Sequence, residues 1–233
     1  MTSKSRTAET YERIKKDILD GRYLPNERLA IDRLSEGGKV SPGAVREALS
    51  RLTSDGLVVA EAQRGFFAAP VSAVDLRDLT EVRVEIEVRC LASAMEHRTL
   101  RWEADLIAAH HQLAMTPKSV GAGRDLRMNE AWSDLHAQFH AALVATCANS
   151  WWLKLRGQLF LQAERYRRLL AGTPSVGARD VDFEHERIMQ AAIGHDTGVA
   201  CSLLAEHLRK TASALLASRP PESTNLRWEP LTM

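Results

Sequence analysis

The sequence lacks the features of a membrane protein or a secreted, disulfide-bonded protein. No run of about 18 uninterrupted apolar residues occurs, so we expect no membrane span and no membrane partner. The first residues are polar and lead into no apolar signal segment, which predicts a cytoplasmic location. The three cysteines, Cys90, Cys147 and Cys201, are odd in number and widely spaced, which favours reduced core residues over disulfides or a thiolate metal site.

An excess of charge of either sign is also missing. The chain has 31 Lys and Arg against 30 Asp and Glu, a net charge of +1. Residues 1–70 hold 12 basic and 10 acidic residues, and the remainder holds 19 and 20, so the asymmetry is small. Any affinity for nucleic acid must therefore come from the local placement of Arg and Lys.

The chain is long enough for two modest domains, with 233 residues of which 45% are hydrophobic. We expect a flexible arm over 1–9, a first domain over 10–70, a helical domain over 75–217 and a loosely ordered tail over 219–233. From residue 75 strand signals vanish and helical periodicity predicts an antiparallel bundle of about six helices, so the fold class is mainly α. The six expected helices are roughly 75–97, 101–115, 124–147, 150–171, 179–194 and 196–217.

The first domain carries the pattern of a helix followed at once by a hairpin. Ser41 suits an N-cap, Pro42 suits the first helical position because its missing N–H has no partner there, and Gly56 ends the helix. Two β-prone runs follow at 57–60 and 66–69. Together with two shorter helices before it, this pattern predicts an N-terminal winged helix-turn-helix.

In a helix-turn-helix the second helix enters the major groove, and its N-terminal residues meet base edges. The competing interpretation is a small helical domain with ordinary surface arginines. The arginines of the helix serve bases or phosphates, and the turn of the hairpin offers an arginine to a minor groove. The expected contacts to double-stranded DNA are Ser41, Gly43 and Arg46, with Arg51 further back and Arg64 and Gly65 at the wing.

This segment resembles the winged helix-turn-helix of the GntR family of bacterial transcription regulators. The resemblance covers residues 10–70 and implies sequence-specific DNA binding. The motifs that carry it are Leu29 to Leu34, Val40-Ser41, Val45-Arg46-Glu47-Ala48-Leu49, Leu52, Gly56-Leu57-Val58 and Arg64-Gly65. Most members have Ser-Arg-Thr-Pro-Val-Arg where this chain has Ser-Pro-Gly-Ala-Val-Arg, so Pro42 replaces the first recognition arginine. Base preference then depends more on Arg46, Gly43 and the wing.

Four histidines of the helical domain lie beside core-type positions. His136 and His140 are spaced i,i+4 and face the same way from one helix, whereas His185 and His207 lie on two later helices. Four imidazoles that point into one bundle suit Zn, Ni, Cu or Fe. The alternative is a set of separate hydrogen-bonded or surface histidines. The other four, expected at the surface or in loops, are His97, His110, His111 and His195.

The helical domain resembles the FCD domain of the FadR-type branch of the GntR family. Metal-binding members carry Asp-x-x-x-His on one helix, a His that opens a later helix and a His on the last. These positions fall on His136, His140, His185 and His207, which implies a divalent transition metal, with zinc or nickel first. The usual Asp is His136 here, and Asp134 lies roughly 200° around the helix, so it should not substitute.

The same resemblance implies an effector site. Arg83 and Glu87 match the Arg-x-x-x-Glu of the first bundle helix, where the arginine holds a carboxylate. The alternative is an exposed i,i+4 ion pair. Arg165, in Glu-Arg-Tyr-Arg-Arg, is a second and weaker effector candidate. Motifs around Trp102, His136 and Glu164 are similar to those of regulators of C4–C5 dicarboxylate and amino-acid-derived acid catabolism.

These features predict a DNA-binding transcription regulator, a repressor, whose operator affinity is controlled by a small carboxylate bound at a metal site. A homodimer would bind a palindromic operator, and the carboxylate would change the placement of its two DNA-binding units. One alternative is a regulator that senses the metal itself. Another is a helical-bundle metal hydrolase, disfavoured because Ala137 stands where the general base of His-Glu-x-x-His would be. We therefore expect no enzyme.

Overall fold

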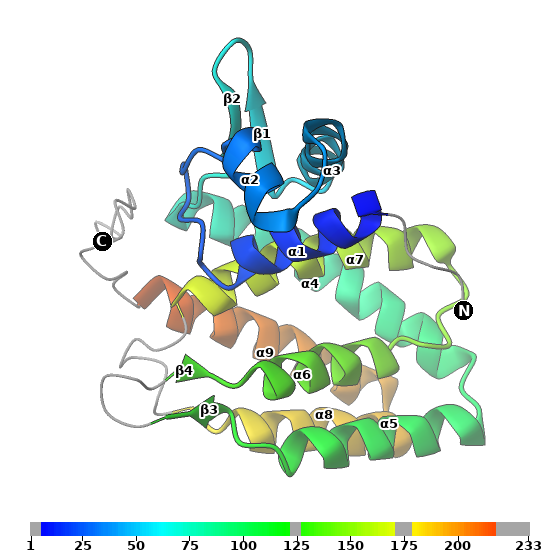
Figure 1. The fold of residues 1–233 in the computed structure, drawn as a ribbon. Coiled ribbons are helices and arrows are strands. Elements are labelled where there is room, and N and C mark those ends of the chain that lie inside the picture. Colours follow the sequence, from blue (N-terminus) through cyan, green and yellow to red (C-terminus); the bar gives the residue numbers. More distant parts are fainter. Residues whose placement is uncertain (1–5, 122–126, 171–178, 218–233) are drawn as a thin grey trace. The chain divides into compact units, whose positions relative to one another are not determined.

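A computed structural model describes residues 6–121, 127–170 and 179–217 of the chain. Within these ranges it is mainly helical, with two small antiparallel sheets of two strands each (Figure 1), which confirms the expected fold class. The described chain divides into two units. Among the described residues, unit 1 holds those up to Asp75 together with Gln162–Leu169, and unit 2 holds Leu76–Leu161, Leu170 and residues 179–217. No helix in the described ranges is long and apolar enough to cross a bilayer.

Unit 1 has a helical core and a hairpin. The apolar faces of its helices pack together, and Ile14, Leu34 and Leu49 are almost completely buried. The Ser41 hydroxyl accepts a hydrogen bond from the amide of Ala44 at 3.3 Å, which confirms the expected N-cap. The elements are α1 (Arg6–Leu19), α2 (Ile31–Gly38), α3 (Pro42–Ser54), β1 (Val58–Glu61) and β2 (Gly65–Ala68).

The hairpin is short and its tip lies at the expected place. Its register pairs Val58 with Ala68 and Glu61 with Gly65, so residues 62–64 form the tip. Gly65 has a φ of +99°, a conformation that side chains disfavour, and this turn therefore requires a glycine. The wing thus ends in a three-residue loop that carries Arg64.

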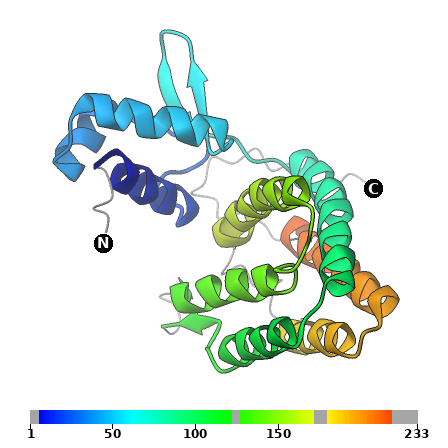
Figure 2. The ribbon, with the colours of Figure 1, turned by 90° about the vertical axis from the view of Figure 1, so that its right-hand side faces the viewer.

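Unit 2 is the helical bundle. Helix α5 packs on α6 and α8, and α8 packs on α9 (Figures 1 and 2). Leu91, Leu106, Phe139, Ile188 and Leu204, from five different helices, are completely or almost completely buried in its core. The helices are α4 (Ala73–Glu96), α5 (Leu100–Ala114), α6 (Glu130–Ala142), α7 (Ser150–Leu170), α8 (Val181–Ile193) and α9 (Thr197–Ala217).

Two expected boundaries are wrong. Helix α1 begins at Arg6, so at least residues 6–9 of the expected arm are helical; the Thr10 hydroxyl bonds to the Arg6 carbonyl at 2.7 Å, and Glu9 lies in the favourable first turn. Residues 1–5 and the tail from 218 lie outside the described ranges. The expected helix over 124–147 occupies only Glu130–Ala142.

The shorter α6 has a local cause. The Asn129 side chain caps it by accepting the amide of Ala131 at 3.1 Å, and a small hairpin, β3 (Ser119–Val120) with β4 (Arg127–Met128), precedes it. The sequence pattern did not indicate this hairpin, whose strands have two residues each. The other domain limits stay predictions.

Candidate functional site

The structure brings the four selected histidines together inside unit 2. His136 and His140 come from α6, His185 from α8 and His207 from α9, and all four side chains are buried, with 1% to 6% of their surface exposed. Helix α6 places two of them because its i,i+4 positions share the inward face. Three helices therefore deliver imidazoles to one point of the bundle.

The distances within this histidine cluster suit a single ion. One ring nitrogen from each residue can be chosen so that all four lie within 4.8 Å of one another. The ring centroids of His136 and His140 are 4.5 Å apart, and those of His185 and His207 are 4.7 Å apart. Imidazole nitrogens about 2 Å from one ion lie at most about 4 Å apart, so the four rings are close to coordination distances and need to draw together slightly around an ion. The alternative of separate surface histidines does not describe this geometry.

Burial favours the neutral form of His140 and His185. Desolvation, followed by the positive charge of neighbouring groups, lowers the pKa of His140 and of His185 well below the ordinary value. Neither ring nitrogen of His140 or of His185 has a hydrogen-bond partner among the described residues, although all four atoms are buried. Buried polar atoms without partners are costly, and neutral imidazoles are the form that binds metal.

Trp132 extends the cluster on α6. Its ring stacks on that of His136 at a centroid distance of 4.9 Å and an interplanar angle of 22°. Trp132 is itself buried, and its i,i+4 spacing from His136 is the sequence signal that would have identified it. The stack fixes the orientation of the first ligand candidate.

A buried charge network lies next to the histidines. Arg83 Nε lies 3.5 Å from Glu87 Oε1, and Arg156 Nε donates to Glu87 Oε2 at 2.8 Å. Arg156 also donates to the carbonyl of His140 at 2.7 Å, and both guanidinium groups lie over the ring of Phe160. The Arg83–Glu87 pair therefore exists but is buried, unlike the exposed pair of the alternative interpretation.

The sequence did not identify Arg156 as part of this network, because it is 69 residues from Glu87 and no local spacing connects them. Arg83 and Arg156 both contact the Glu87 carboxylate, so two guanidinium groups lie on one side of the histidine cluster.

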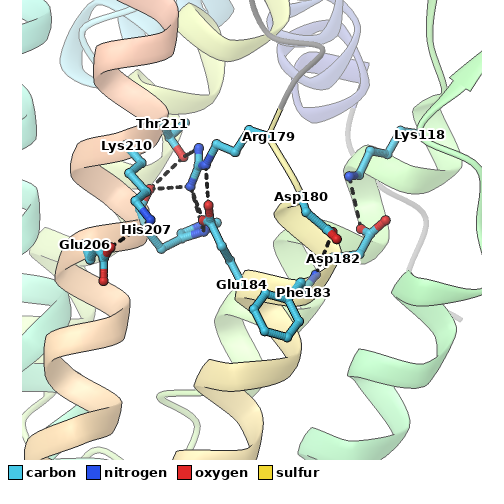
Figure 3. A network of polar contacts seen from close by, with 10 residues as sticks. All are labelled: Lys118, Arg179, Asp180, Asp182, Phe183, Glu184, Glu206, His207, Lys210 and Thr211. Carbon is cyan, nitrogen blue, oxygen red and sulfur yellow. Dashed lines mark hydrogen bonds and ion pairs between the residues drawn. The ribbon is translucent and has the colours of Figure 1, made fainter.

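A second polar network contacts His207 at its Nδ1 atom (Figure 3). Glu184 Oε2 lies 2.9 Å from His207 Nδ1, and Arg179 binds the same carboxylate. Burial raises the pKa of Glu184, but the hydrogen bonds from His207 and Arg179 outweigh it and hold that pKa at about 2. Glu184 was also missed, although it directly precedes His185 in the sequence.

The remaining histidines stay out of the cluster. His97, His111 and His195 are exposed, as expected, whereas His110 is half-buried with its ring edge against Phe139 at 5.8 Å. Asp134 is exposed on α6 and lies outside the cluster, which agrees with its expected angle around the helix.

Arg165 has another environment. It belongs to unit 1, only 2% of its surface is exposed, and its guanidinium donates to the carbonyls of Ala69 and Pro70. Burial lowers its pKa to about 10. These contacts give no support to effector binding by Arg165, which stays a prediction.

Most of the residues expected to contact DNA are exposed in unit 1, and Gly65 is half-buried. Ser41, Gly43 and Arg46 lie at the start of α3 with their side chains or backbone open to solvent. Arg51, also exposed, lies over the ring of Tyr11 at 4.3 Å. A stacked guanidinium keeps its charge at the surface while its orientation is restricted.

At the wing, Arg64 is 70% exposed and forms an ion pair with Glu61. Its guanidinium also lies 5.3 Å from the ring centroid of Phe67. Gly65 follows it in the left-handed region. The tip therefore presents one cation beside a glycine, as the sequence predicted.

Two family models match the chain. The model described as bacterial regulatory proteins, gntR family, matches residues 6–68, and the FCD domain matches residues 78–210.

Relatives with similar sequences carry the names of regulators. The HTH-type transcriptional regulator BphR of Paraburkholderia xenovorans is 35% identical over 207 residues, which cover 88% of this chain and 83% of that protein. The HTH-type transcriptional repressor GlaR of Escherichia coli is 30% identical over 201 residues, which cover 85% and 90%. Both names denote transcription regulators, not enzymes.

Solved structures share the fold. Escherichia coli McbR/YncC has a TM-score of 0.73 and 21% identity, with 92% of this chain and 98% of that chain covered. A GntR transcriptional regulator from Rhodococcus sp. RHA1 has a TM-score of 0.71 and 21% identity, with 93% and 100% covered.

Proposed function

We propose that this chain, which belongs to the gntR family of bacterial regulatory proteins and carries an FCD domain, is a transcription regulator controlled by a carboxylate at a metal site. The single observation that carries the proposal is the buried cluster of four imidazoles in unit 2. Regulators of this family bind DNA and act as dimers.

The donor set supports a transition metal. His136, His140, His185 and His207 would hold a divalent ion, and zinc and nickel are proposed first because both accept imidazole nitrogen readily. Such an ion would supply positive charge, and with five or six ligands it would also offer coordination positions beyond the four imidazoles. The orphaned ring nitrogens of His140 and His185 support this assignment, since bonding to an ion would satisfy buried atoms that the protein leaves unsatisfied.

The charge balance supports an anionic effector. Four neutral imidazoles contribute no negative charge, whereas the family's usual aspartate would remove one unit. Arg83 and Arg156 add two guanidinium groups beside the cluster, where both contact Glu87. A small carboxylate would then bind an open position of the ion and the guanidinium of Arg83.

The winged helix-turn-helix would supply the output. Ser41, Gly43 and Arg46 are proposed to meet base edges in the major groove, Arg51 the phosphate backbone, and Arg64 with Gly65 the minor groove. A homodimer would place two such units on a palindromic operator. The repressor name of the Escherichia coli relative favours repression, with release of the operator when carboxylate binds.

Fluorescence anisotropy with duplexes selected by the protein from a random-sequence library tests this function. The metal-stripped and zinc-loaded proteins are each titrated with such a duplex, without and with succinate or glutarate. We expect the zinc-loaded protein to lose affinity only when the dicarboxylate is present.

Release by zinc alone would favour the alternative of a regulator that senses the metal. Release that is the same with and without zinc would contradict a role for the histidine cluster. Failure to select any duplex would contradict DNA binding itself.

A further inference from the structure

The ring of His207 has two charged side chains close to its Nδ1 atom. In Figure 3 the side chains of Glu184 and Arg179 converge on it, together with Thr211 one turn along α9. Glu184 Oε2 lies 2.9 Å from His207 Nδ1, and the Glu184 side chain is 17% exposed, so water competes little for this contact. A short, shielded contact of this kind constrains the ring.

The direction of the hydrogen bond follows from the chemistry of the partners. An ionised carboxylate can only accept, so the contact with Glu184 requires a proton on His207 Nδ1. Arg179 also has a nitrogen 3.2 Å from Nδ1, but a guanidinium can only donate, and one ring nitrogen cannot serve both. The contact with Glu184 is the shorter of the two.

Arg179 has enough other acceptors to leave Nδ1 to the carboxylate. Its Nε donates to Glu184 Oε1 at 2.6 Å, and its two terminal nitrogens donate to Thr211 Oγ1 at 2.7 Å and to the His207 carbonyl at 2.8 Å. Thr211 donates to the same carbonyl at 2.9 Å. The guanidinium thus fixes the Glu184 carboxylate and the backbone of His207 at once.

We propose that Glu184 is the positioning residue of the histidine cluster: it holds His207 in the Nδ1–H tautomer, which leaves Nε2 as the nitrogen offered to a metal. The inference rests on the proposed metal site. In it, Glu184 acts on the proposed ligand His207 and does not itself bind the ion. Carboxylates that accept the second N–H of a ligating imidazole orient the ring and raise its basicity. Arg179 serves as the clamp that keeps Glu184 in place.

Two variants of matched charge test the role of Glu184. Glu184→Gln removes the carboxylate behind His207. Glu206→Gln removes an equal charge from the residue next to His207, where Glu206 is 52% exposed and pairs with Lys210 at 2.7 Å (Figure 3). Zinc affinity of the full-length protein is measured by competition with a chromophoric chelator.

We expect Glu184→Gln to weaken zinc binding about 10- to 100-fold, the range for such outer partners, and Glu206→Gln to leave it within about twofold. Equal affinities of the two variants would overturn the proposal. Circular dichroism checks that both variants remain folded.

Nitrogen NMR of the histidine rings in the metal-free protein gives a readout that needs no metal. We expect only the Nδ1–H tautomer of His207 in the wild type and both tautomers in Glu184→Gln, because an amide can donate as well as accept. An Nε2–H tautomer in the wild type would overturn the proposal even if Glu184→Gln does not fold. If the wild type binds no zinc, the metal site fails, and the tautomer still decides whether Glu184 positions the ring.

Discussion

The two units of this chain differ in whether their candidate functional side chains are exposed or buried. In unit 1 the residues expected to contact DNA, such as Arg46 and Arg64, are exposed around an apolar core. In unit 2 the four clustered histidines and Glu87 are buried within the bundle, and the side chain of Arg83 is only 11% exposed. The difference matches the size of the proposed ligands, because DNA must be met at a surface, whereas an ion and a small acid can be enclosed.

If this contrast is correct, the largest effect belongs to a buried ligand. His140→Ala should weaken zinc binding by more than about 100-fold, the upper range for loss of an outer partner, because a direct ligand is lost. Competition with a chromophoric chelator measures this effect. DNA affinity in the absence of carboxylate should stay within about twofold; a parallel loss of DNA binding would break the separation of the two roles.

A smaller effect is expected at the exposed surface. Arg46→Ala should weaken binding to the selected duplex by about 1–3 kcal/mol, the range for an arginine that contacts a base. Anisotropy titration measures it, and Arg101→Ala, which removes an 85% exposed arginine of α5, is the control. Unchanged DNA affinity in Arg46→Ala would remove this residue from the interface.

The next effect concerns the effector. Arg83→Gln should weaken glutarate binding to the zinc-loaded protein about 10-fold, since a hydrogen bond to a charged group contributes about 1.5–3 kcal/mol. The control is Arg89→Gln, on the same helix, which breaks the exposed pair of Arg89 with Glu85. Calorimetry that finds the same loss for both variants would contradict a specific role of Arg83.

The smallest effect per residue is expected in the pH dependence of the free energy of unfolding. Burial holds the pKa values of His140, His185 and His207 below the ordinary value, so below about pH 6.5 the unfolded state binds protons that the native state excludes. The free energy of unfolding of the metal-stripped protein should therefore fall as the pH drops from 7.5 to 6. The loss is at most about 1 kcal/mol for each histidine at pH 6.

Urea unfolding at each pH measures this dependence. His111→Gln, which removes an exposed histidine outside the cluster, is the control. A stability that rises toward pH 6 would show that the histidines gain protons on folding. The pKa of Glu184, at about 2, adds nothing to this window because the carboxylate is ionised in both states.

Features encoded by local spacing could be predicted from the sequence. The cap at Ser41, the wing with Arg64 and the shared face of His136 and His140 all follow from helix and turn geometry. His185 and His207 were selected because they lie beside core-type positions of later helices, and the resemblance to a known family supported the set of four. Their meeting in space then followed from the bundle.

Features set by long-range packing could not be predicted. Nothing local connects Arg156 with Glu87, and the sequence does not show that Glu184 turns toward His207 on another helix. Arg165 was selected from its motif, yet in the structure its donors meet backbone carbonyls of Ala69 and Pro70. In each case the partner is distant in sequence, so periodicity carries no information about it.

Calorimetric titration of the protein with glutarate, once metal-stripped and once zinc-loaded, tests the central claim most directly. Coordination of the carboxylate to an ion held by the four histidines predicts binding at least about 10-fold tighter in the zinc-loaded protein, a coupling of about 1.4 kcal/mol or more. Equal affinity in the two states would contradict the account.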